Sequence, residues 1–347
     1  EGRRRMGKEP TAVTEQPIRL LYYAAETFPT ERVDVAVLFG RELLSRGHSV
    51  DFVMQAACAS QPTGPQPWNG RTVFVGGTRD GGGATARISR QLKELVHDLR
   101  SLRLLGRGRY DAVQVRDKFM IAPLAAWYAR RLGLKFFFWL SFPMPESDLE
   151  NARAGNAFIP AITMLRGRIT GWLLYRWILP RADHVFVQSE RMRQQVAAHG
   201  LDPARMTPIP MGVDLSSLPP FAPRRARSPA DELTIGYLGT LDAIRRLGVL
   251  VEMLAVLRRA GVPARLLLIG DAVSRRDRIA LESQAEMLGV RDALEITGML
   301  PRTEAMRRMN EAHLAISPIF RSPILDVGSP TKLVEYLAMG VPVVANS

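Results

Sequence analysis

One arrangement of apolar and polar positions recurs along the chain. It consists of an amphipathic helical stretch, a glycine and a short apolar run, at residues 43–53, 129–139, 254–269, 287–296 and 337–344. Glycine supplies the left-handed conformation that ends many helices. Continuous apolar runs are typical of parallel strands covered on both faces. The alternation therefore predicts a doubly wound α/β architecture.

The alternation breaks once, at residues 215–232, which lack periodicity and are rich in proline. A new apolar run follows at 233–238 and resembles the run at 18–23 that begins the first domain. This predicts a disordered polar tail at 1–16, a Rossmann-like domain at 17–214, a linker at 215–232 and a second Rossmann-like domain at 233–347. We expect the two domains to face a central cleft, with ligands at the carboxyl ends of the strands.

Two further expectations concern chain organisation. The Gly/Pro-rich stretches 61–70 and 76–85 are predicted as loops of the first domain. The apolar run 341–345 should be followed by another strand–helix unit, so we expect the second domain to be incomplete.

The composition and charge of the chain indicate which classes of partner to expect. Lys and Arg number 47 against 34 Asp and Glu, a net charge of +13, which favours anionic ligands or an anionic membrane surface. No basic stripe interleaved with aromatic residues occurs, so nucleic acid is not an expected partner. Residues 1–16 contain no apolar signal segment, and the one cysteine fits a reducing compartment. We expect a cytoplasmic protein.

The loop after the first strand of the second domain has the composition of an anion site. It leads into a helix, whose first backbone N–H groups are free to bind anions. Arg245 or Arg246 could neutralise a diphosphate there, and an ordinary turn with two solvated arginines is the alternative. The candidate diphosphate-binding residues in this loop are Gly239, Thr240, Arg245 and Arg246.

The segment from Ser329 to Ser347 is the most informative part of the sequence. It contains a small-residue turn, a short helix with Lys332 and Glu335, a glycine stop and an apolar strand. Lys332 and Glu335 lie three residues apart on one helical face, where the lysine can bind phosphate and the carboxylate a sugar hydroxyl. A surface ion pair between these two side chains is the alternative. Gly298, after the strand 294–296, could let the backbone approach a base.

Polar residues also end two strands of the first domain. Arg116 and Asp117 follow one strand and Glu146 follows another, so all three are candidate catalytic residues at the strand ends where ligands bind. A local ion pair is the alternative for Arg116 and Asp117. Residues 161–180 combine arginines with aromatic residues and predict either a helix on an anionic leaflet or a core helix. No HxxxH or DxD spacing occurs, so we expect no metal site.

Several motifs together carry a family resemblance. In order they are RGHSV (46–50), ADHVFVQSE (182–190), IPMGVD (209–214), GYLG (236–239), GD (270–271), TG (297–298) and the segment 329–347. With this order and spacing the chain resembles the family 4 glycosyltransferases of the GT-B fold over residues 18–347. The resemblance implies a retaining enzyme that uses a nucleotide-diphosphate sugar as co-substrate and needs no cofactor or metal.

The resemblance also implies residue roles. Glu335 matches the second carboxylate of the family's Glu–seven residues–Glu motif and is expected to hold the ribose hydroxyls, and Arg245 or Arg246 matches a phosphate-binding cation. The backbone at Gly328, Ser329 and Thr331 is expected to face the diphosphate and the donor sugar. The first Glu position is Val327, preceded by Asp326, which departs from the family pattern at the residue that contacts the sugar.

These observations lead to one functional expectation with two alternatives. We expect a hexosyltransferase that moves a sugar to a lipid-linked or polysaccharide acceptor, in the cytoplasm or peripherally at the inner face of the plasma membrane. A sugar-nucleotide epimerase of the same fold is one alternative. A non-catalytic subunit that binds a nucleotide is the other, and Val327 favours it.

Overall fold

The computed structural model describes residues 16–346, except residues 82, 107, 154, 156–158, 220–227, 229–230 and 323. The predicted tail 1–16, apart from its last residue, and most of the predicted linker lie outside the described residues. By contacts between Cα atoms, the chain divides into two compact units. The first unit contains the described residues up to Trp139 together with Arg181–His184, and the second contains Leu140–Pro180 and the residues from Val185 onward. The domain boundaries inferred from the linker stay a prediction.

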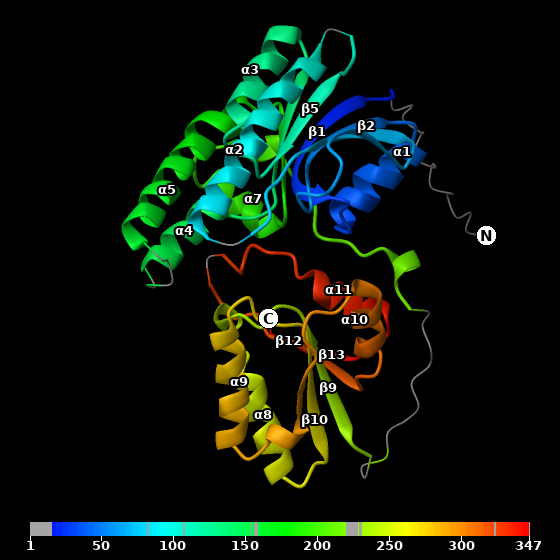
Figure 1. Cartoon of the computed structure of the whole chain (residues 1–347), viewed down its shortest axis with the longest axis vertical. Helices are drawn as coiled ribbons and strands as arrows, with labels where there is room; N and C mark the ends of the chain where they lie inside the picture. The colour runs from blue at the N-terminus through cyan, green and yellow to red at the C-terminus, as the bar shows by residue number, and fades with distance from the viewer. Residues whose placement is uncertain are drawn as a thin grey trace, which may run out of the picture. The chain divides into compact units, whose positions relative to one another are not determined.

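Strands and helices alternate along most of the chain (Figure 1). The strands are β1 (Arg19–Phe28), β2 (Ser49–Ala56), β3 (Gly64–Trp68), β4 (Arg71–Gly76), β5 (Ala112–Arg116), β6 (Lys135–Leu140), β7 (His184–Val187), β8 (Met206–Pro208), β9 (Leu233–Leu238), β10 (Ala264–Ile269), β11 (Leu294–Ile296), β12 (Leu314–Ser317) and β13 (Val343–Ala345). The helices are α1 (Leu43–Ser45), α2 (Ala84–Ser101), α3 (Ala122–Leu132), α4 (Met144–Arg153), α5 (Pro160–Leu173), α6 (Leu179–Arg181), α7 (Glu190–Ala197), α8 (Gly248–Arg259), α9 (Arg275–Met287), α10 (Arg302–Met309) and α11 (Thr331–Ala338). Two π-helical segments, Asp34–Glu42 and Leu174–Ile178, precede α1 and α6.

The first unit is built on a largely parallel sheet with the strand order β3-β4-β2-β1-β5-β6. The central strand β1 pairs in parallel with β2 and β5, and its residues Leu21, Tyr22 and Tyr23 are fully buried. Helix α3 ends at Gly133, whose φ of 73° is the left-handed conformation expected of a glycine stop. The next residues form β6. The recurring helix–glycine–strand pattern thus predicts these elements correctly.

The prediction of a loop at residues 61–70 is wrong. The strand β3 occupies Gly64–Trp68 and pairs antiparallel with β4. Pro65 and Pro67 lack the backbone N–H group, and an edge strand tolerates proline because one of its sides pairs with no neighbour. Trp68 stabilises the position of β3, because its ring packs edge-on against Phe28 and Phe52.

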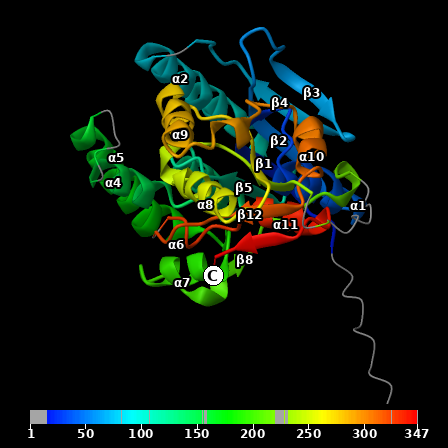
Figure 2. The same ribbon diagram turned by 90° about the horizontal axis from the view of Figure 1, so that it is seen from below.

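The second unit contains the parallel pair β7–β8 and a separate parallel sheet with the order β11-β10-β9-β12-β13. Figures 1 and 2 show α8 and α9 on one face of the five-stranded sheet, with α10 and α11 on the other. Residues of β10 alternate between two apolar clusters, because Leu266 and Leu268 pack under α8 and α9 whereas Leu267 and Ile269 pack under α10 and α11. A sheet covered on both faces explains the continuous apolar runs. The predicted α/β fold class is confirmed.

Within the described residues, no helix combines the length and the apolar character that crossing a bilayer requires.

Candidate functional site

The predicted donor site lies at the carboxyl edge of the five-stranded sheet. The chain runs outward from β9 through β10 to β11 and then returns to the other side of β9 as β12, so the strand order reverses between β9 and β12. Ligands of open α/β sheets bind at such a reversal. The loops there approach closely, since a Cβ atom on Gly270 would lie 2.1 Å from the carbonyl oxygen of Gly239. Glycine is required where two backbones pack this tightly.

The side chain of Lys332 lies against the loop that contains Gly239. Its Nζ lies 5.3 Å from the centroid of the Tyr237 ring, and a Cβ atom on Gly239 would fall 1.8 Å from Nζ. Burial lowers the pKa of the Lys332 ammonium to about 8, and the nearby Arg245 lowers it as well. Two cations held together in a desolvated place form a binding site for an anion.

The structure separates the two arginines of the loop 239–247. Arg246 adopts a left-handed backbone conformation with φ of 49°, and its guanidinium lies over the Phe320 ring at 5.4 Å. The charge of Arg245 instead lowers the pKa of Lys332, and the buried Nε of Arg245 has no hydrogen-bond partner among the described residues. Of the two candidates, Arg245 is the one whose charge lowers the pKa of Lys332.

Glu335 does not pair with Lys332. Its side chain is 5% exposed, and its Oε1 lies 2.7 Å from Nη1 of Arg302, the first residue of α10. Helix α11 is fixed against β9 one residue further on, where the Tyr336 hydroxyl accepts a hydrogen bond of 2.8 Å from the backbone N–H of Leu238. The surface ion pair that the sequence left open is therefore not the arrangement in the structure. Sequence reasoning missed Arg302.

Other residues that were predicted to bind the donor lie at the same edge of the sheet as Lys332 and Glu335. The Thr240 carbonyl accepts a hydrogen bond from the Tyr237 hydroxyl, and Gly298 has φ of 74° in the loop before α10. Thr331 begins α11 and is half-buried, and Gly328 is exposed. The structure thus collects Gly239, Thr240, Arg245, Gly298, Lys332 and Glu335 at one edge of one sheet.

The segment before α11 makes contacts of a different kind. The Asp326 carboxylate pairs with Arg321 at 2.9 Å and with Arg191 at 3.2 Å. Val327 is buried, and its carbonyl accepts a 2.7 Å hydrogen bond from the Ser189 hydroxyl. The Ser329 hydroxyl accepts a hydrogen bond from the Met211 backbone. Asp326 is therefore engaged by two arginines, and a buried valine stands where the family pattern has a glutamate.

In the first unit, Arg116 is the centre of a buried charge cluster at the end of β5. Its side chain has no exposed surface, and its Nη2 lies 2.6 Å from the Asp34 carboxylate and 3.6 Å from that of Glu26. Burial opposes the charge of Arg116, but Tyr22, Glu26 and Asp34 raise the pKa of its guanidinium above the ordinary value. Sequence reasoning missed Glu26 and Asp34, which come from β1 and the π-helical segment after it.

Asp117 and Glu146 have different surroundings. Asp117 follows Arg116 with φ of 53°, and its carboxylate lies 3.7 Å from the Arg116 Nε. Glu146 belongs to the second unit, in the first turn of α4, where its Oε1 accepts a 2.6 Å hydrogen bond from the Tyr175 hydroxyl. Burial, and then the charge of Glu146, raise the pKa of Tyr175 above its usual range. The roles of Arg116, Asp117 and Glu146 stay predictions.

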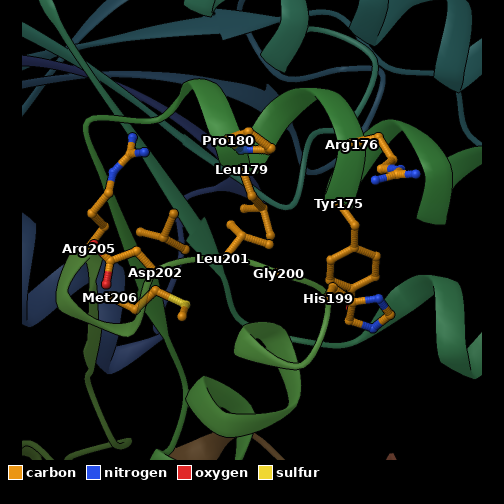
Figure 3. Close-up of a pocket in the computed structure, with 11 residues that line it drawn as sticks. Tyr175, Arg176, Leu179, Pro180, His199, Gly200, Leu201, Asp202, Arg205 and Met206 are labelled. Atoms are coloured by element: carbon orange, nitrogen blue, oxygen red, sulfur yellow. The ribbon is translucent and has the colours of Figure 1, made fainter.

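Two cavities adjoin Tyr175. Their volumes are about 320 and 350 Å³, and both are lined by Tyr175, Arg176 and His199. The rings of Tyr175 and His199 stack with centroids 3.7 Å apart (Figure 3). Figure 3 also shows that Leu179 and Leu201 point toward one another in the first cavity. These residues combine apolar walls with guanidinium groups.

Comparison with known proteins identifies the family. Two α/β units with largely parallel sheets and a candidate site at the strand ends fit the GT-B fold of glycosyltransferases, which the similar solved structures share. Residues 34–212 match the family model of the glycosyl transferase 4-like domain, and residues 232–347 match that of the glycosyl transferases group 1. The chain therefore belongs to this glycosyltransferase family, as its motifs predicted. A comparison with functionally curated proteins gave no match.

Solved structures share the fold. Sucrose-phosphate synthase from Thermosynechococcus elongatus has 18% sequence identity and a TM-score of 0.64, over 94% of this chain and 81% of that one. Anabaena Alr3699/HepE in complex with UDP and glucose has 16% identity and a TM-score of 0.60, over 94% and 80%. WaaG, a glycosyltransferase involved in lipopolysaccharide biosynthesis, has 16% identity and a TM-score of 0.58, over 94% and 80%.

Proposed function

We propose that this glycosyltransferase moves a hexosyl unit from a nucleotide-diphosphate sugar to an acceptor hydroxyl, with retention of the anomeric configuration and without a metal ion. The observation that carries the proposal is the Lys332 ammonium beside Gly239 at the carboxyl edge of the second sheet, on which the charge of Arg245 also acts. In the transfer, the bond from the anomeric carbon to the diphosphate breaks and a bond to the acceptor oxygen forms. The acceptor proton passes to the departing diphosphate, whose growing negative charge the two cations stabilise.

Uridine is the nucleoside we propose, because HepE, which shares the fold, was solved with UDP and with UDP-glucose. In this proposal Glu335 holds the ribose hydroxyls, and the backbone around Gly298 lies next to the base. Ser329, Thr331 and Gly328 lie along the diphosphate and the donor sugar. We carry retention over from the resemblance of the chain's motifs to the family 4 glycosyltransferases.

On the acceptor side we keep Arg116, Asp117 and Glu146 as proposed residues. Because Arg116 has no exposed surface, it would act by holding the Asp34 and Glu26 carboxylates rather than by touching the acceptor. The Asp117 carboxylate, which is 14% exposed, would accept a hydrogen bond from an acceptor hydroxyl. Glu146 would act through Tyr175, because its Oε1 accepts a hydrogen bond from the Tyr175 hydroxyl and its Oε2 is buried.

We also propose that the acceptor is lipid-linked, or a growing polysaccharide, at the cytoplasmic face of a membrane. Four apolar residues of α5 at helical spacing are between 55% and 62% exposed: Ile162, Leu165, Ile169 and Trp172. Arg166, Arg168 and Arg176 lie along the same stretch. An exposed apolar stripe with basic flanks is typical of helices that lie on anionic membranes.

Sedimentation with lipid vesicles tests this membrane contact. The wild-type protein should sediment with vesicles that contain phosphatidylglycerol and remain in solution with pure phosphatidylcholine. The double variant Leu165→Ser/Ile169→Ser should lose most of this binding. Val256→Ser changes a residue of α8 that is 56% exposed and serves as the control. Equal binding by both variants would exclude α5 as the contact.

Donor turnover tests the enzymatic proposal. Consumption of UDP-sugar, GDP-sugar or ADP-sugar only when acceptor is present supports a transferase, isomerisation of the donor alone supports an epimerase, and saturable binding without turnover supports a non-catalytic subunit. A donor at 100 times its Kd should stabilise the protein by about 2.7 kcal/mol. Arg245→Ala should weaken binding strongly and Arg246→Ala weakly, since only Arg245 acts on Lys332. Equal losses would contradict the assignment.

A further inference from the structure

Arg302 connects two helices of the second unit at the site. It is the first residue of α10, directly after the loop that contains Gly298, and its Nη1 reaches across to Glu335 in α11. Both helices rest on the same apolar cluster, through Met306 and Met309 of α10 and Tyr336 of α11. The relative position of Arg302 and Glu335 is thus set by core packing rather than by a flexible loop.

The ion pair with Arg302 engages only one of the two oxygens of the Glu335 carboxylate. Oε1 faces Arg302, whereas Oε2 has no hydrogen-bond partner among the described residues. Oε2 of Glu26 and Oε2 of Glu146 are fully buried without a partner, and Oε2 of Glu335 does not belong to that group. An ionised carboxylate accepts hydrogen bonds at both oxygens. Glu335 is therefore held through Oε1, and no hydrogen bond among the described residues occupies Oε2.

The ion pair between Arg302 and Glu335 also determines whether Lys332 has a carboxylate partner. Glu and Lys side chains three residues apart on a helix readily form an ion pair. Among the described residues, no carboxylate lies within ion-pair distance of the Lys332 Nζ, although Glu335 is on the same helix, because Arg302 engages Glu335 instead. The ammonium consequently stays next to Gly239.

We infer that Arg302 is a positioning residue of the donor site, which orients Glu335 toward a ribose and at the same time keeps Lys332 unpaired for a diphosphate. This inference rests on the proposed function. Without Arg302, Glu335 would turn to Lys332, and the site would lose its ribose acceptor and its free cation together.

The test compares binding of UDP and 2′-deoxy-UDP by titration calorimetry at pH 7. The wild-type protein should prefer UDP, and Arg302→Gln should bind UDP about tenfold more weakly and lose the preference, since a hydrogen bond to a charged group is worth about that factor. Arg302→Lys keeps the charge and should recover part of both. The control is Arg307→Gln, on the same helix, where Arg307 pairs with Glu304 and Glu311 and should not affect binding.

A pH series adds a readout that a merely structural role would not change. The charged or titratable groups around Lys332 are Arg245, Asp242, Tyr237, Glu335 and, through Glu335, Arg302. If Glu335 turns to Lys332 in Arg302→Gln, the pH at which UDP binding is lost should move upward. The variant Arg302→Gln/Glu335→Gln leaves no Glu335 carboxylate without its partner and should fold even if Arg302→Gln does not.

The outcomes separate this inference from the proposed function. Loss of the ribose preference in Glu335→Gln but not in Arg302→Gln would overturn the inference and leave the proposed function standing. A wild-type protein that binds none of UDP, GDP and ADP would overturn both. Loss of the preference in both variants, with recovery in Arg302→Lys, supports both.

Discussion

Replacement of Lys332 by methionine should stabilise the ligand-free protein and weaken its binding of a nucleotide diphosphate. The folded protein lowers the pKa of Lys332 from 10.5 to about 8, chiefly by burial. Below pH 8 the group is protonated in both the folded and the unfolded state, and the cost of burying the charge is fully present. Between pH 8 and 10.5 the unfolded state binds more protons, so stability rises with pH until the cost has disappeared.

The size of the effect follows from the shift. A difference of about 2.5 pKa units corresponds to roughly 3 kcal/mol, taken as an upper bound for Lys332→Met at pH 7. Methionine keeps a long, unbranched side chain that can fill the same space beside Tyr237. The gain should shrink as the pH approaches 10.5, because the wild-type lysine then loses its charge in both states.

Urea unfolding at pH 7 and pH 10, followed by circular dichroism, measures this difference, and titration with UDP measures the loss of binding. Lys118→Met is the contrasting variant, since Lys118 is also buried but pairs with Asp98 at 2.9 Å and Glu94 at 3.1 Å. Removal of Lys118 strands two carboxylates and should cost about 3–5 kcal/mol.

Two results would refute the reasoning about Lys332. The first is destabilisation by Lys332→Met at pH 7 comparable to that of Lys118→Met, which would mean that the Lys332 ammonium has a stabilising partner. The second is a gain in stability that does not depend on pH, which would mean that packing and not charge burial is responsible. Unchanged UDP affinity would remove Lys332 from the donor site.

Three further predictions concern other parts of the site. Gly239→Ala should weaken UDP binding in titration and cost roughly 1–3 kcal/mol in urea unfolding, because the new methyl group would displace the Lys332 ammonium. Arg116→Gln should cost about 3–5 kcal/mol by removing the buried partner of Asp34 and Glu26, which then keep only the half-exposed Arg32, whereas Arg19→Gln, at a surface pair, should cost much less. Tyr175→Phe removes a 2.6 Å hydrogen bond to a carboxylate and should lower the thermal midpoint by an amount that corresponds to about 1–3 kcal/mol.

Much of the fold could be predicted because the pattern of apolar and polar residues follows which positions are buried. The runs at 233–238 and 264–269 are continuous and apolar, and both are strands of a sheet covered on two faces. The pattern failed at β3, where Pro65 and Pro67 alternate with polar and small residues. An edge strand on the sheet needs neither a continuous apolar run nor a full set of N–H groups, so its sequence looks like a loop.

The candidate site could be predicted only in part. Lys332 and Glu335 were found because their spacing and the preceding turn are local in the sequence. Arg302 is 33 residues from Glu335, and nothing in the sequence near either residue indicates that one side chain reaches the other. The same holds for Arg116 and Asp34, which the sheet brings together from different elements.

The contact between α11 and β9 has a consequence for folding. Tyr336 is fully buried, and its hydroxyl meets the backbone of Leu238, 98 residues earlier in the chain. Contacts between segments so far apart form slowly, because the intervening chain must first be ordered. Synthesis completes β9 long before α11, so the contact between them forms only after α11 has left the ribosome. In the proposed function, a nucleotide-sugar donor would therefore stabilise only chains in which α11 has already docked on β9.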